Sequence, residues 1–113
     1  MSGPALTPDL ALDYLGELST DIRAGVVVDS QGDVAAVTGG DDERGEKTRT
    51  LALELLDAAA EAGEGVDQVE VVTAEGSVFA VRGEAWTVAV VAGRQPLASL
   101  MFYDLRNVVR DLG

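Results

Sequence analysis

The sequence contains no cysteine and no histidine. Without cysteine the chain has no disulfide bond and no thiolate nucleophile, and without either residue it lacks the usual ligands of a zinc site. Catalytic devices that depend on an imidazole base are excluded as well. Long apolar runs are also missing, because the longest, residues 85–92, is far shorter than the ~20 residues that span a bilayer. We therefore expect no cofactor, no metal site and no insertion into a membrane.

Basic residues are scarce, with 8 Lys and Arg against 20 Asp and Glu, so the formal net charge is -12. Such a surface repels nucleic acid and anionic membranes, and its simplest role is to keep the protein soluble. Aromatic residues make up only 4% of the chain, so the core must be built from Val, Leu and Ala. The first residues lack the basic and apolar regions of a signal peptide, which leads us to expect a cytoplasmic location.

A length of 113 residues suits one domain, and no internal linker or repeat divides the chain. We expect a single domain over residues 1–113, with its core at about 8–112 and with residues 1–6 flexible. Apolar periodicity and turn residues predict the elements of this domain. The predicted helices are 8–23, 46–63 and 97–112, and the predicted strands are 24–29, 34–38, 69–73, 78–82 and 86–92.

These elements predict an α+β fold, a five-stranded antiparallel sheet with three helices in the order α-β-β-α-β-β-β-α. The first and fifth strands are the most apolar and should lie in the middle, with the second and third at the edges. In the first helix Leu10, Tyr14, Leu18 and Ile22 recur every four residues beside Ala11 and Leu15, and we expect this stripe to face the core.

The second helix has more apolar surface than one sheet can cover. Its apolar arc is about 220° wide, whereas a helix on one sheet needs little more than ~100°. The third strand is short, apolar and near an edge, and Glu70 is its one charge against edge pairing. Both features predict a homodimer, although an exposed surface of small alanines would also explain the wide arc. The residues that we expect in the dimer interface are Leu51, Leu53, Leu55, Leu56, Ala60, Val69 and Val71.

The last helix carries a second candidate surface opposite its core stripe. Leu100, Tyr103, Arg106 and Arg110 lie on its outer face, and Tyr and Arg are enriched where proteins bind each other. A surface tyrosine packed on arginine stems would explain the same pattern. The acidic stripe of the second helix, which includes Glu54 and Asp57, is a competing surface for a basic partner.

Residues 40–48 resemble a phosphate-binding loop of the pattern G-x-x-x-x-G-K-[ST]. Glu46, however, separates Gly45 from Lys47, and acidic residues 41–43 occupy the place of the phosphate oxygens. We expect a solvated acidic loop instead of a nucleotide site. The acids near the hairpin and this loop do not have calcium-loop spacing, and no serine lies in a nucleophile elbow. We therefore expect no enzymatic activity.

Four stretches of the sequence together resemble the Roadblock / dynein light-chain family in its compact bacterial form. They are 24–33 (AGVVVDSQGD), 76–81 (GSVFAV), 86–92 (WTVAVVA) and 100–106 (LMFYDLR). The last stretch is the most specific and is similar to versions from high-GC Gram-positive bacteria. The resemblance covers residues 8–112 and implies a profilin-like α/β sandwich.

The resemblance also implies a function. Members of the family are non-catalytic partners: dynein light chains, scaffolds for Ras-like GTPases and, in gliding motility, a GTPase activator. Bacterial forms are often encoded with a small GTPase and a sensor kinase. The family dimer joins through the second helix and third strand into one continuous sheet. No pattern selects Arg82 or Arg94 as an arginine finger. A small-ligand sensor and a structural subunit of a larger complex remain alternative hypotheses.

Overall fold

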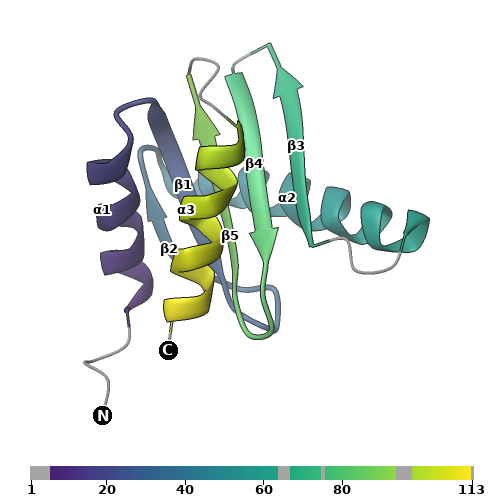
Figure 1. The fold of residues 1–113 in the computed structure, drawn as a ribbon. Helices are drawn as coiled ribbons and strands as arrows, with labels where there is room; N and C mark the ends of the chain where they lie inside the picture. The colour runs from purple at the N-terminus through teal and green to yellow at the C-terminus, as the bar shows by residue number, and fades with distance from the viewer. Residues whose placement is uncertain (1–5, 64–66, 75, 94–97, 113) are drawn as a thin grey trace.

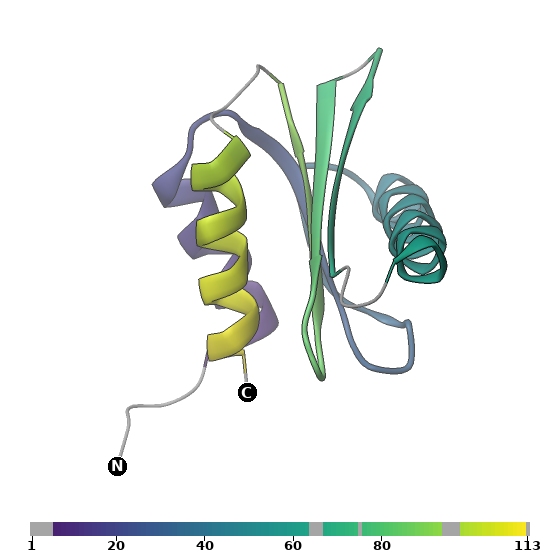
Figure 2. The same ribbon diagram turned by 45° about the vertical axis from the view of Figure 1, so that its right-hand side comes forward.

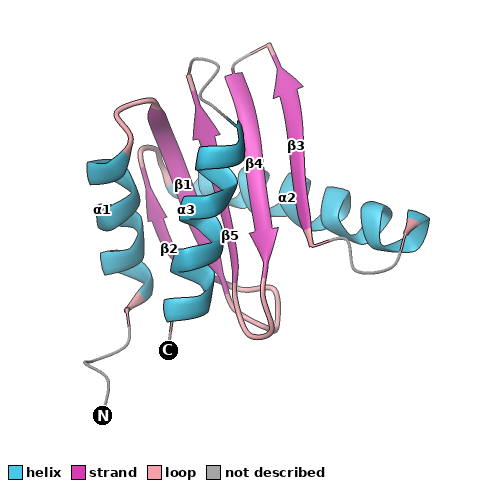
Figure 3. Ribbon diagram, in the orientation of Figure 1, coloured by secondary structure: helices cyan, strands magenta, loops and turns pink. Residues whose placement is uncertain are grey.

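A computed structural model describes residues 6–63, 67–74, 76–93 and 98–112. The elements along the chain are α1 (Pro8–Leu18), β1 (Ile22–Val28), β2 (Val34–Thr38), α2 (Asp42–Ala62), β3 (Gln68–Thr73), β4 (Gly76–Arg82), β5 (Thr87–Ala92) and α3 (Ala98–Asp111) (Figures 1 and 3). The α+β class and the predicted order of elements are confirmed.

The five strands form one sheet in the order β2-β1-β5-β4-β3, and every neighbouring pair is antiparallel. The prediction that the first and fifth strands lie inside and the second and third at the edges is confirmed. β1 and β5 are covered on two faces, and Val26, Val27 and Val28 of β1 are fully buried.

Helices lie on both faces of the sheet (Figure 2). α1 and α3 cover one face and α2 crosses the other. The larger core cluster, which includes Leu15, Phe79 and Leu105, fills the space under α1 and α3. A smaller cluster under α2 includes Leu56, Ala80 and Ala89. Successive strand residues point to opposite faces, so Val27 belongs to the first cluster and Val26 to the second.

The predicted core stripe of the first helix is wrong. Ala11 and Leu15 are buried as expected, but Leu10 (55% exposed), Tyr14 (46%) and Leu18 (46%) face outward. Leu12, which is 4% exposed, takes the inward position instead. The helix also ends at Leu18, and Ile22 pairs with Ala92 in the sheet instead of extending the stripe. Two apolar stripes lie side by side on this helix, and the sheet covers the one that contains Leu12.

The second helix begins earlier than predicted. Asp41 is its N-cap and accepts a hydrogen bond from the Arg44 backbone N–H at 2.8 Å. Asp42 and Glu43 then lie in the first turn, where the helix dipole favours acidic side chains. The expected acidic loop is therefore the first turn of α2. Its acidic residues are a helix-start signal, and the expectation of a solvated loop at these positions is wrong.

The ends of the chain differ partly from expectation. The backbone N–H of Leu6 donates to the Asp111 carbonyl at 3.0 Å, and Leu6 bridges Leu112. Residues 1–5 lie outside the described residues, as do Arg94 and Leu97. β5 begins at Thr87, one residue after the predicted start, and β4 begins at Gly76, two residues before it.

Candidate interaction surfaces

One flank of α2 is used inside the subunit. Leu56 and Ala52 are fully buried and pack in the cluster with Val26 and Ala80. Leu53 is partly buried against the same cluster. Leu56 is therefore unavailable to a second subunit, and its prediction as an interface residue is wrong. A helical wheel shows that the apolar arc of α2 is wider than one sheet can cover. It does not show which flank of that arc the subunit's own sheet covers.

The other flank of α2 is less covered. Leu51 and Leu55 are partly buried and lie four residues apart on the side opposite Leu53. Leu51 lines a surface depression of 580 Å³ together with Thr73 of β3 and Val78 of β4. Ala60 is exposed. This flank, close to the β3 end of the sheet, is the part of α2 that a second subunit can still bury.

β3 forms an edge of the sheet (Figure 1). It pairs with β4 from Gln68↔Val81 to Thr73↔Gly76, and its other edge meets no strand within the described residues. Val69 packs toward α2, Val71 is partly buried, and Val72 is 68% exposed on the opposite face. An apolar, regular edge of this kind is a template for pairing with another strand.

The outer stripe of α2 is acidic and exposed. Glu54 is exposed, and Asp57 forms an ion pair with Arg82 of β4 at 2.8 Å. This pair ties the middle of α2 to the end of β4. Because its two side chains are 33% and 69% exposed, the pair contributes little to stability.

The outer face of α3 presents an aromatic residue and two arginines. Tyr103 is 63% exposed and Leu100 is 57% exposed. Arg106 donates a hydrogen bond to the side-chain oxygen of Gln68 in β3, and Arg110 pairs with Asp111 at 3.3 Å. The four residues predicted on this helix are all exposed, and among them Arg106 lies beside the β3 edge through its contact with Gln68.

The residues of the phosphate-loop pattern do not form a loop. Gly45 lies inside α2 and is buried against β2, where a Cβ would approach Val37 to 2.8 Å. The Thr48 hydroxyl donates to the Arg44 carbonyl at 3.0 Å, and Lys47 lies 3.9 Å from Glu43. Gly45 thus serves close packing of the helix on the sheet, and its backbone N–H donates within the helix to the Asp41 carbonyl.

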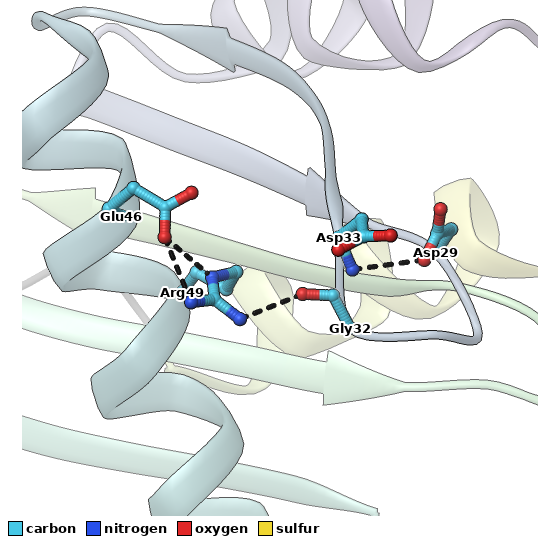
Figure 4. Close-up of polar contacts among 5 residues, drawn as sticks. All are labelled: Asp29, Gly32, Asp33, Glu46 and Arg49. Atoms are coloured by element: carbon cyan, nitrogen blue, oxygen red, sulfur yellow. Dashed lines mark hydrogen bonds and ion pairs between the residues drawn. The ribbon is translucent and has the colours of Figure 1, made fainter.

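The acidic residue Asp29 stabilises the turn between β1 and β2 (Figure 4). A carboxylate oxygen of Asp29 accepts from the backbone N–H groups of Gln31 at 2.9 Å and of Asp33 at 3.0 Å. Arg49 of α2 then donates to the Gly32 carbonyl at 2.8 Å and pairs with Glu46 at 2.9 Å. No group of three potential metal-binding residues occurs in the described part of the chain.

Several depressions on the surface of the described residues are open to solvent. Depressions of 580 and 400 Å³ open at the surface beside α2 and beside the hairpin turns. A further groove of 380 Å³ separates the end of α3 from the β4–β5 turn. Buried apolar side chains fill the space between the helices and both faces of the sheet. No helix among the described residues is long and apolar enough to cross a membrane.

The arrangement defines a class of structure, an antiparallel five-stranded sheet with two helices on one face and one on the other. It is the Roadblock/LC7 fold. A Roadblock/LC7 domain from Streptomyces avermitilis superposes with a TM-score of 0.81 at 24% identity, over 93% of each chain. MglB from Myxococcus xanthus matches with a TM-score of 0.68 at 14% identity, over 91% of this chain and 82% of that one.

A structure of MglB with a tetrameric arrangement also has this fold, with a TM-score of 0.62 at 17% identity over 96% of each chain. No protein-family model and no curated protein matches the sequence. The likeness is thus one of fold, and it confirms the resemblance at that level.

Proposed function

We propose that the protein is a non-catalytic homodimer that regulates, or serves as a scaffold for, a small Ras-like GTPase in the cytoplasm. The observation that carries the proposal is the Roadblock/LC7 fold over nearly the whole chain, combined with a β3 edge that pairs with no other described strand and lies next to a partly uncovered α2 flank. The family that the sequence resembles acts with GTPases of this kind, and the partner class comes from that resemblance.

Self-association is supported by two neighbouring features of one side of the molecule. The outer edge of β3 meets no strand in the described part of the chain, so a second β3 can pair with it, and Leu51 and Leu55 retain apolar surface beside it. Pairing two β3 edges across a twofold axis gives both edges a hydrogen-bonding partner and covers both α2 flanks, because each subunit offers the same surface to the other. The tetrameric MglB shows that a protein of this fold can form a higher assembly.

Docking of the GTPase is assigned to the outer face of α3. Tyr103 and Leu100 give it exposed apolar area, and Arg106 and Arg110 give it cations in a protein with a net charge of -12. Tyr and Arg are the residues that most often dominate binding energy. The acidic stripe of α2 with Glu54 is the competing surface, and binding there would depend steeply on salt.

The test is a titration of the purified protein with a small GTPase encoded beside its gene. Calorimetry at two salt concentrations, with the GTPase loaded with a GTP analogue or with GDP, gives the affinity in each state. We expect binding in one state that is much weaker in the other. Absence of binding in both states would refute a GTPase role and leave a structural subunit as the remaining hypothesis. Hydrolysis assays with the same pair show whether the protein also stimulates the GTPase.

A further inference from the structure

The groove of 380 Å³ beside the end of α3 has two sides of different origin. The C-terminal half of α3 and the turn between β4 and β5 lie at the same end of the sheet, where β3 begins (Figure 1). Arg106, Val109 and Arg110 line the groove from α3, and Asp67 and Glu84 line it from the sheet side. Its volume is within the range of small-molecule sites in proteins.

The apolar lining of the groove belongs to the core. Trp86 is partly buried against the larger core cluster, of which Val81 and Leu112 are members. The backbone N–H of Gly83 donates to the Trp86 carbonyl at 2.7 Å, which closes the turn between β4 and β5. Gly83 also lets this turn approach α3, because a Cβ there would collide with Val109. The packing of the core therefore fixes the shape of the groove.

The two sides of the groove carry opposite charges. α3 contributes two cations, Arg106 and Arg110, and the sheet side contributes two carboxylates, Asp67 and Glu84. All four residues are exposed. The remaining charged residue of the lining, Arg82, is turned toward α2 by its ion pair with a carboxylate of that helix at 2.8 Å. Two positive and two negative groups are thus left for the groove.

The cations of α3 are not neutralised by the carboxylates across the groove. Arg106 donates to the neutral side chain of Gln68, and Arg110 pairs at 3.3 Å with its chain neighbour Asp111. Among the described residues, no ion pair joins either arginine to a carboxylate of the sheet side. The pair of Arg110 and Asp111 is 71% and 55% exposed, so it is weak. Both signs of charge can therefore contact a ligand in the groove.

We propose that this groove binds a free α-amino acid with an apolar side chain. The ligand carboxylate binds Arg106 and Arg110, because guanidinium groups match the geometry of a carboxylate. The ligand ammonium group lies against Asp67 or Glu84, and the apolar side chain covers the ring of Trp86. A ligand with a single charge would meet one attractive and one repulsive side, so the arrangement selects a zwitterion.

The amino-acid site does not rest on the proposed function. Arg106 and Arg110 also belong to the α3 face assigned to the GTPase, but amino-acid binding is tested with the purified protein alone. Failure of amino-acid binding would leave the GTPase proposal intact. Absence of GTPase binding would likewise leave the amino-acid site intact.

The probe is L-phenylalanine, and the readout is the indole N–H signal of Trp86 in two-dimensional NMR. Trp86 is the only tryptophan of the chain, so its indole signal is assigned without ambiguity. We expect a saturable shift with a Kd of about 1 mM, as is typical of a ligand of this size. N-acetyl-L-phenylalanine lacks the ammonium group and L-phenylalaninamide lacks the carboxylate. Each should bind at least ~5-fold more weakly than L-phenylalanine.

Two double variants assign the two charges of the ligand to the two sides of the groove. Arg106→Gln with Arg110→Gln should weaken the binding of L-phenylalanine at least ~5-fold and that of L-phenylalaninamide less than ~2-fold. Asp67→Asn with Glu84→Gln should also weaken the binding of L-phenylalanine at least ~5-fold, but it should not weaken the binding of N-acetyl-L-phenylalanine.

The matched control lies outside the groove on α2. Arg44→Gln with Lys47→Gln removes the same charge as the arginine variant from two exposed positions and should change the Kd of L-phenylalanine less than ~2-fold. Because all of the replaced side chains are exposed, the three double variants should keep the wild-type circular dichroism.

Four outcomes would overturn the proposal. The absence of a saturable shift of the Trp86 signal up to ~20 mM L-phenylalanine would show that the groove is not a site. Equal binding of either derivative would show that one side of the groove is not used. An equal loss in the α2 control would reduce the effect to general attraction between charges. Tighter binding of the dipeptide phenylalanylglycine would show that the two sides are spaced for a longer zwitterion than a free amino acid.

Discussion

Two double variants of α2 separate its two flanks. Leu51→Glu with Leu55→Glu places charges on the flank that the subunit leaves partly uncovered, and Leu53→Glu with Leu56→Glu places them on the flank that packs against the sheet. We expect the first variant to fold and to lose dimerisation. We expect the second to unfold, because Leu56 is fully buried and a carboxylate there has no partner.

The loss of dimer stability in the Leu51, Leu55 variant follows from how much surface these two leucines still expose. Full burial of a leucine stabilises by about 1.5–3 kcal/mol, and Leu51 and Leu55 are already partly buried in the subunit. Each therefore adds about 0.75 kcal/mol on dimerisation, and two subunits contribute four such side chains, or about 3 kcal/mol. Losing this interaction energy raises the dissociation constant of the dimer roughly 100-fold. Four glutamates in the interface add a further desolvation cost.

Light scattering at micromolar concentration measures the mass directly. The wild type should give about twice the monomer mass of 11.7 kDa, and the Leu51, Leu55 variant should give the monomer mass with unchanged circular dichroism. A wild-type monomer would refute the dimer. A Leu51, Leu55 variant that keeps the dimer mass would show that this flank of α2 is not the contact.

Three further predictions concern single sites. Calorimetric titration with GTP or ATP and magnesium should give no heat of binding for the wild type or for Lys47→Ala, because Lys47 lies in a helix and not in a phosphate-binding loop. Submillimolar binding by the wild type that is lost in the variant would contradict this prediction. Tyr103→Ala should weaken GTPase binding by about 2 kcal/mol with little dependence on salt, and calorimetry that finds no change would move the site to α2. Gly39→Ala should lower the free energy of unfolding in urea by at least ~2 kcal/mol, because Gly39 has a φ of 77° and its Cβ would clash with the Arg23 carbonyl. Gly16→Ala is its control, since Gly16 has open space in a helix and should be neutral or stabilising by up to ~1 kcal/mol.

The sequence contains enough information to predict the strands and their order. The runs around Val26–Val28 and Val88–Val90 are apolar without alternation, which indicates strands covered on both faces, and the structure places β1 and β5 inside the sheet. Short turns such as Asp29 to Asp33 require antiparallel neighbours, and the Asp29 carboxylate does bind the turn backbone. The apolar pattern of a strand and the residue types of a turn are local properties, so they can be recognised in a single sequence.

Which apolar stripe faces inward was harder to predict. On α1 the period-four stripe of Leu10 and Tyr14 is as regular as any core stripe, yet the helix turns Leu12 toward Gly25 of β1, where no side chain keeps the two apart. On α2 the same ambiguity led to the assignment of Leu56 to the interface. The choice depends on the shape of the sheet surface, which is a tertiary property. The start of α2 had a usable signal in Asp41, an N-cap residue followed by two acids.

The central claim is that two copies of this chain act together on one GTPase system. It is tested most directly by the solution mass of the mixture, measured by size-exclusion chromatography with light scattering, with the GTPase encoded beside the gene and loaded with a GTP analogue. The account predicts a complex that contains two copies of the 11.7 kDa chain and at least one GTPase, and no such complex for Tyr103→Ala at the same concentrations. Separate peaks for the dimer and the GTPase, in the GTP-analogue state and in the GDP state, would contradict it.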